Sequence, residues 1–193
     1  MKQILTLGMA MMIAFAISAQ TGHLTFKGVP IDGTLNEFVG KLKQKGLTHI
    51  GTEQGIAIFK GEFAAHKGCS IAAIAHESGE VYRVGVMFPE QETWLRLYND
   101  YSSIKDMLTQ KYGEPTTVVE EFQSYSGGKY DDDNTRMHYV KFDKCRYVTD
   151  FTTESGTIEI RIDHNDALEC YVILIYEDTT NGDKVRSSAI DDL

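Results

Sequence analysis

The chain has 193 residues, 42% of them hydrophobic, and its 19 Lys and Arg stand against 28 Asp and Glu for a net charge of −9. A surface of this sign repels nucleic-acid phosphates and anionic lipids, so we expect neither nucleic acid nor a membrane surface as a partner. The length suits one domain or two small fused halves, with enough residues to bury a core.

The first 19 residues have the features of a secretory signal peptide. Lys2 provides the positive start, residues 4–17 are almost all apolar or small, and small residues lead to an expected cleavage after Ala19 or Gln20. The apolar stretch has about 14 residues, whereas a membrane-spanning helix needs roughly 20. Cleavage is therefore favoured over a membrane anchor.

The expected mature protein begins near residue 20 and has no segment for membrane insertion. Removing 19 of the 193 residues leaves 174, and the loss of Lys2 takes the net charge from −9 to −10. We expect a periplasmic or secreted protein that forms a single α+β domain over residues 20–193. The sequence does not determine its oligomeric state.

A short strand and a helix are predicted at the start of this domain. The apolar run at 24–26 indicates the strand. Thr34 and Glu37 have the spacing of a capping box, which predicts that a helix begins here, and Gly46 marks its end. The apolar face of this helix consists of Leu35, Phe38, Val39 and Leu42.

Three strands with short connections are predicted next, at residues 56–63, 69–76 and 81–88. Connections this short join antiparallel neighbours, so the three strands should form a meander. In the last of them Val84 and Val86 alternate with Arg83 and Gly85, which indicates one packed face and one wetter face.

A long helix is predicted at 92–112, closed by Gly113 and Pro115. Large side chains recur along it at intervals of three and four residues, as on a stripe that faces a core. An aromatic stripe can also be a ligand site, but the helical spacing favours packing against the core. The stripe consists of Trp94, Leu97, Tyr101, Ile104 and Leu108.

The second half of the domain repeats this order. A polar loop at 124–134 and a short helix at 135–142 precede three further strands, at 145–153, 157–163 and 169–177. In the middle strand Glu159 and Arg161 alternate with isoleucines, so one of its faces should be buried and the other solvated.

The end of the chain combines a very apolar strand with a polar tail. Residues 171–176 are apolar throughout, which predicts a central strand that is covered more fully than the others. The tail from Asn181 onward is polar, and we expect it to be partly ordered at best.

These elements predict an α+β fold with antiparallel sheet and helices packed on one face. A helix followed by a three-stranded meander occurs twice, in pseudo-repeats of about 24–88 and 90–178, as a divergent duplication would produce. The two halves share the pattern but almost no sequence.

Three cysteines remain in the mature chain, and an odd number leaves at least one unpaired. Each lies in an apolar, strand-like run, where a reduced Cys behaves as a small hydrophobe, so buried free thiols are the favoured interpretation. A Cys145–Cys170 disulfide is the alternative. The cysteines are Cys69, Cys145 and Cys170.

The sequence contains six histidines but no metal-ligand motif. His66 and Cys69 form an H-x-x-C pair without a second pair at zinc-finger spacing, and His76 lacks the second His of H-E-x-x-H. No nucleophile motif, phosphate-binding loop or dinucleotide fingerprint occurs, and spacing alone cannot select a catalytic pair of carboxylates. We therefore predict no cofactor and identify no catalytic residue.

One acidic run could bind calcium, because Asp131, Asp132 and Asp133 are consecutive in the polar loop and calcium prefers carboxylate oxygens. The run lacks the alternating ligands, central Gly and terminal Glu of an EF-hand. An N-cap at Asp133 or Asn134 for the following helix is the favoured interpretation.

Five short segments consist of turn and core residues, and they lie at 26–33, 111–115, 145–147, 156–160 and 189–193. In these segments the chain resembles uncharacterised exported proteins of Gram-negative anaerobes. The resemblance covers most of the mature chain, but turn and core residues imply no activity. The repeated helix and meander is also similar in layout to β-lactamase-inhibitor-like and PepSY-like periplasmic modules, a resemblance that implies protein binding through sheet or loop surfaces.

The main functional hypothesis is a non-enzymatic binding module that contacts a protein or peptide through its open sheet face. Arginines ringed by carboxylates on solvated strand positions suit such a surface, although an ordinary hydrated sheet face would have the same pattern. Alternatives are an envelope or extracellular hydrolase with a carboxylate-lined cleft, a calcium-binding accessory protein and a structural envelope component. The candidate binding residues are Arg83, Arg146, Asp150, Glu159 and Arg161.

Overall fold

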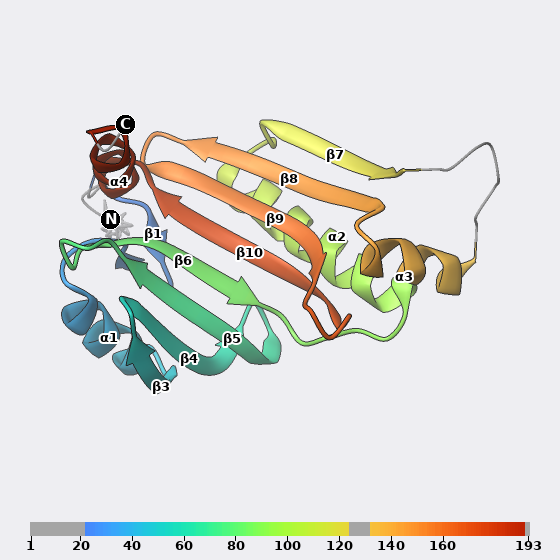
Figure 1. The fold of residues 1–193 in the computed structure, drawn as a ribbon, viewed down its shortest axis with the longest axis horizontal. Coiled ribbons are helices and arrows are strands. Elements are labelled where there is room, and N and C mark those ends of the chain that lie inside the picture. Colours follow the sequence, from blue (N-terminus) through green and yellow to red (C-terminus); the bar gives the residue numbers. More distant parts are fainter. Residues whose placement is uncertain (1–21, 124–131, 192–193) are drawn as a thin grey trace, which may run out of the picture.

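The computed structural model describes residues 22–123 and 132–191, so the predicted signal peptide lies outside the described residues. The described part contains one large antiparallel sheet with the strand order β3-β4-β5-β6-β10-β9-β8-β7 (Figure 1). Its strands are β3 (Thr48–Glu53), β4 (Ile56–Phe63), β5 (His66–Ala75), β6 (Val81–Met87), β7 (Thr117–Phe122), β8 (Cys145–Thr153), β9 (Gly156–His164) and β10 (Cys170–Asp178).

The other elements are four helices and a small two-stranded sheet near the start of the described chain. They are β1 (Thr25–Phe26), β2 (Val29–Pro30), α1 (Leu35–Gln44), α2 (Trp94–Tyr112), α3 (Asp133–Lys141) and α4 (Thr179–Asp191). The predicted α+β class with antiparallel sheets is therefore confirmed. None of the helices in the described ranges has the length and hydrophobicity of a membrane span.

The large sheet consists of two meanders that meet where β6 pairs with β10. Each meander follows a helix, as predicted, but each contains four strands rather than the three expected. The additional strands, β3 and β7, are the two edges of the sheet. They are mostly exposed, so their sequences lack the alternation that marks a strand with one buried face.

The core fills the space between the helices and one face of the sheet. In β9 the side chains of Ile158, Ile160 and Ile162 are buried, as their alternation predicts. The whole predicted stripe of α2 is buried, and the Tyr101 hydroxyl lies 2.6 Å from the Thr149 hydroxyl in β8. The stripe is therefore a core face, and burial raises the pKa of Tyr101 above its usual range.

Two of the predicted helix starts can be compared with the observed caps. The capping box of α1 is confirmed, because the Thr34 side chain accepts from the backbone of Glu37 and the Glu37 side chain accepts from the backbone of Thr34. The predicted cap of α3 is wrong, since the N-cap is Asp132 rather than Asp133 or Asn134. The Asp133 carboxylate instead accepts from the backbone N–H groups of Trp94 and Leu95, at the start of α2.

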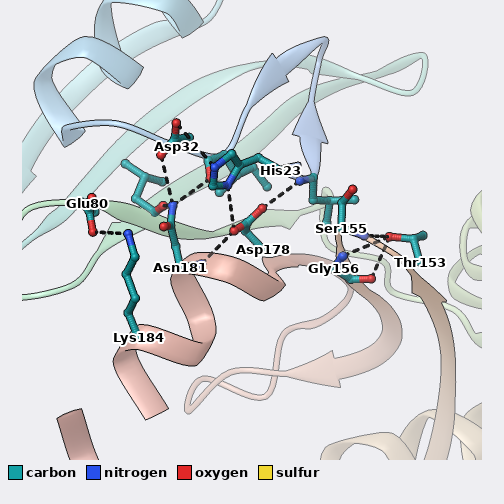
Figure 2. A network of polar contacts seen from close by, with 12 residues as sticks. His23, Asp32, Glu80, Thr153, Ser155, Gly156, Asp178, Asn181 and Lys184 are labelled. Carbon is teal, nitrogen blue, oxygen red and sulfur yellow. Dashed lines mark hydrogen bonds and ion pairs between the residues drawn. The ribbon is translucent and has the colours of Figure 1, made fainter. Parts of the chain in front are cut away.

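The polar C-terminal tail forms α4, which corrects the expectation of partial order at best. The helix is anchored by Asp178, whose side chain is fully buried (Figure 2). The Asp178 carboxylate accepts from the backbone N–H of Leu24 at 2.8 Å and of Asn181 at 2.9 Å. The Nδ1 atom of His23 lies 3.1 Å from the same carboxylate.

Asn181 continues this network into the first half of the chain. Its side-chain amide donates to the backbone carbonyls of Ile31 and Val81 at 3.3 and 3.0 Å (Figure 2). One polar cluster therefore joins the start of the described chain, the end of β10 and the first turn of α4. Composition and periodicity could not predict this anchoring, because Leu24, Ile31 and Val81 are 100 or more residues away from their partners in sequence.

All three cysteines are free, as the favoured interpretation predicts, and Cys69 and Cys170 are buried whereas Cys145 is partly buried. Strand β9 separates Cys145 in β8 from Cys170 in β10, so their Cα atoms are about two strand spacings, or about 10 Å, apart. A disulfide requires less than about 7 Å. Burial raises the pKa of the Cys145 thiol to about 12, which leaves it a poor nucleophile at neutral pH.

Candidate functional site

The face of the large sheet that points away from the core is here called the open face. In Figure 1, α2 lies behind the strands, and in the described part of the chain no helix covers the opposite side of the sheet. Alternate residues of every strand point to this side, and the register arranges them in rows that cross the strands. The middle row consists of Ile58, Ala72, Gly85, Ile175, Glu159 and Asp150.

One half of the open face is apolar. Ile56 and Ile58 are 38% and 37% exposed, and the other members of the group are partly buried. We call this group the apolar patch, and it spans β4, β5, β6 and β10. It consists of Ile56, Ile58, Ala72, Ile74, Met87, Ile173 and Ile175. Contiguous apolar side chains on the surface of a soluble protein mark interaction sites more often than isolated ones do.

All five residues that the sequence proposed for binding lie on the open face. Arg83 in β6 forms an ion pair with Glu177, its neighbour in β10. Arg161 in β9 donates to Glu159 at 2.6 Å and to Asp163 at 2.9 Å, along its own strand. Arg146 is exposed in β8, opposite Glu121 of β7.

The fifth residue, Asp150, lies directly opposite Glu159 in the register of β8 and β9. Burial, and then the negative charge of Glu159, raise the pKa of Asp150 above its ordinary value. Within the described ranges, the Asp150 carboxylate has neither a hydrogen-bond partner nor an ion-pair partner. The structure therefore brings four of the five residues together on two adjacent strands, while Arg83 lies two strands away from β9.

The apolar patch lies outside the residues predicted for binding. The continuous hydrophobicity of residues 171–176 predicts a covered central strand. Strand β10 is central, but Ile173 and Ile175 are only partly buried and point to the open face. The missed signal was the absence of polar residues at alternate positions of a strand with no helix over that side.

The residues predicted as calcium ligands do not converge within the described chain. Asp131 lies outside the described residues, and Asp132 and Asp133 cap two different helices. Hydrogen bonds from Thr135 lower the pKa of Asp132. Among residues 22–123 and 132–191, no group of three or more His, Cys, Asp or Glu side chains could hold a metal ion.

A hollow of about 670 Å³ lies on the helix side, between the start of α2, α3 and β8. Its described lining includes Trp94, Tyr98 and Tyr147, whose rings pack against one another. The one carboxylate in this lining is Asp133, and backbone N–H groups of α2 occupy both its oxygens. The described lining of this hollow therefore does not contain the two opposed carboxylates that the hydrolase alternative requires.

His164 lies at the end of β9, and its pKa should be higher than that of an ordinary imidazole. Its Nδ1 lies 2.9 Å from the backbone carbonyl of Asn165 and its Nε2 lies 3.3 Å from the Asp143 carboxylate, so only the protonated ring satisfies both acceptors. The Asn165 carbonyl and then Asp143 raise the pKa of His164. This contact stabilises the fold at pH values below the pKa of His164 in the unfolded chain, which is about 6.5. The stabilisation is lost as the pH rises through the higher pKa that His164 has in the folded state.

An NMR titration of the six histidines should therefore place the pKa of His164 above 6.5. The pKa should fall in the Asp143→Asn variant, which removes one acceptor charge while the Asn165 carbonyl stays. A His164 pKa at or below 6.5 in the unmodified protein would contradict the prediction.

The fold and its surface define the class of the molecule, an α+β protein with an eight-stranded antiparallel sheet that is covered by helices on one face. Comparison with protein-family models, curated proteins and solved structures finds no match for the chain. The function is therefore inferred from the surface chemistry of this molecule.

Proposed function

We propose that the protein is an exported, non-enzymatic binding module that contacts a protein or peptide through the open face. The observation that carries the proposal is the apolar patch, which continues across the sheet into the charged residues of β8 and β9. Residues 1–19 support export, because they have the pattern of a cleavable signal peptide.

The chemistry of the open face supports a macromolecular partner. An apolar centre with arginines and a charged rim is the usual composition of a protein interface. Displacing water from the apolar patch contributes roughly 25 cal/mol for each Å² that a partner covers. The net charge of −9 disfavours nucleic acid and anionic lipid as occupants.

A glycine on the open face provides a direct test. Gly85 is the central residue of the middle row, and a Cβ atom added there would meet no atom within 4 Å. The Gly85→Glu variant should fold normally while placing a charged side chain over the apolar patch. We expect it to retain, in affinity capture from extracts of the source cells, less than about a tenth of the partner that the unmodified protein retains.

Gly40→Glu is the matched control, because Gly40 is an exposed residue of α1 with equally open space at its Cβ. It makes the same change of residue and charge on the helix side of the molecule, so partner capture should be unchanged. If every captured protein were retained equally by Gly85→Glu and the unmodified chain, the proposed function would be wrong.

A further inference from the structure

The chemistry of the partner can be inferred from the middle row of the open face, and this inference rests on the proposed function. Gly85 lies inside the central strand β6, between Ala72 of β5 and Ile175 of β10. Glycine weakens a strand interior and commonly marks close approach of another backbone or ligand. No described side chain lies near its Cβ position, so the approach is open to a partner. Gly85 and Ala72 thus leave two neighbouring positions of the apolar patch without a large side chain, and we call this place the trough.

An acidic pair lies at the other end of the same row. Asp150 and Glu159 are direct cross-strand neighbours, and like charges in that position destabilise a sheet. Arg161 offsets only part of the repulsion, because it is shared between Glu159 and Asp163 and leaves Asp150 without a partner among the described residues. A positive charge from outside the chain would compensate the pair.

The register fixes the spacing between the trough and the acidic pair. Gly85, Ile175, Glu159 and Asp150 lie on four successive strands, and neighbouring strands are about 4.8 Å apart. Gly85 and Asp150 are therefore roughly 14 Å apart, which is about four residues of extended chain at ~3.3 Å per residue. A segment with this spacing would cross the strands rather than pair with an edge.

We propose that the open face binds an extended polypeptide segment that places an apolar side chain in the trough at Gly85 and a Lys or Arg side chain, about four residues away, against Asp150 and Glu159. The apolar group contributes burial, and the cation relieves the repulsion between the two carboxylates. The basic residue sets the direction of the segment on the sheet and selects basic over acidic segments, because charge complementarity across an interface governs specificity.

A peptide library tests the sequence preference directly. Random twelve-residue peptides displayed on phage are panned against the purified protein, and the enriched sequences are synthesised for affinity measurement. We expect enrichment of an apolar residue with a Lys or Arg about four positions away. Enriched peptides without a basic residue at a fixed spacing, or the absence of any peptide that binds more tightly than about 100 μM, would overturn the inference.

Charge-neutralising variants test the acidic pair with a selected peptide. The Asp150→Asn, Glu159→Gln double variant should bind the peptide at least tenfold more weakly at low salt, and high salt should reduce the difference. The control is Asp106→Asn with Glu92→Gln, which removes the same charge from exposed positions in α2 and just before it and should change affinity less than twofold. Equal affinity of the acidic-pair variant and the unmodified protein would overturn the role of the pair.

The failure of this inference can be distinguished from the failure of the proposed function. Peptide binding that is lost in Gly85→Glu but unchanged in the acidic-pair variant would leave the open face as the binding surface and reject the basic anchor. Peptide binding that is unchanged in Gly85→Glu would reject both.

Discussion

Replacement of Asp178 by alanine should lower the free energy of unfolding by about 3–5 kcal/mol, as when one partner of a buried charged contact is removed. The fully buried carboxylate accepts from the backbone of Leu24 and Asn181 and contacts His23. Alanine would leave two buried N–H groups without acceptors and release the first turn of α4. Denaturant unfolding monitored by circular dichroism measures the loss.

Asp183→Ala is the control within the same helix. Asp183 is exposed, and its ion pair with Arg186 is exposed as well, so its removal should change the unfolding free energy by no more than about 0.5 kcal/mol. Asp178→Asn keeps one acceptor oxygen and should fall between the two variants. A loss below about 1 kcal/mol for Asp178→Ala would show that the network does not anchor α4.

Gly156→Ala should also destabilise the protein, by about 3 kcal/mol, because the added methyl group has no room. A Cβ at this first residue of β9 would lie 2.2 Å from the backbone carbonyl oxygen of Glu177 and 3.0 Å from a methyl carbon of Leu24. The nearest atom belongs to the backbone of β10, so relief requires the two strands to move apart. Thermal and denaturant unfolding both measure the effect.

The Gly85→Ala variant carries the same substitution in β6, two strands away from β9, where the added methyl group meets no atom within 4 Å. It should leave stability unchanged or raise it by up to about 1 kcal/mol, since alanine loses less conformational freedom than glycine on folding. Equal destabilisation by the two substitutions would mean that the glycines share a structural role. The contrast matters for function, because it separates a glycine needed for packing from one that leaves a surface open.

The open face and the buried network have different physical roles. In the network at Asp178, the carboxylate accepts from backbone N–H groups and contacts a histidine. These contacts join the start of the described chain to the end of β10 and the first turn of α4. Asp150 has a raised pKa and no side-chain partner among the described residues, although it lies in the same sheet. A carboxylate left in this state on an uncovered sheet face is consistent with a contact that another molecule completes.

The local structure could be predicted from the sequence because its causes are local. The Thr34 capping box and the stripe of α2 depend on residues three or four positions apart, and both are confirmed. The alternation in β9 correctly separated its buried isoleucines from Glu159 and Arg161. The charged half of the candidate site was therefore accessible from periodicity alone, since alternation assigns every strand residue to one of two faces.

What only the tertiary structure decided depends on contacts between distant segments. Strands β3 and β7 bury little of their own surface and are held by pairing, and α4 is anchored by groups more than 90 residues away in sequence. Periodicity also cannot say which face of an apolar strand a helix covers. The sequence by itself determined α1, α2 and α3, most of the strands and the faces of their residues. The register placed Gly85, Ile175, Glu159 and Asp150 in one row that runs through the apolar patch, because alignment across strands is a property of the assembled sheet.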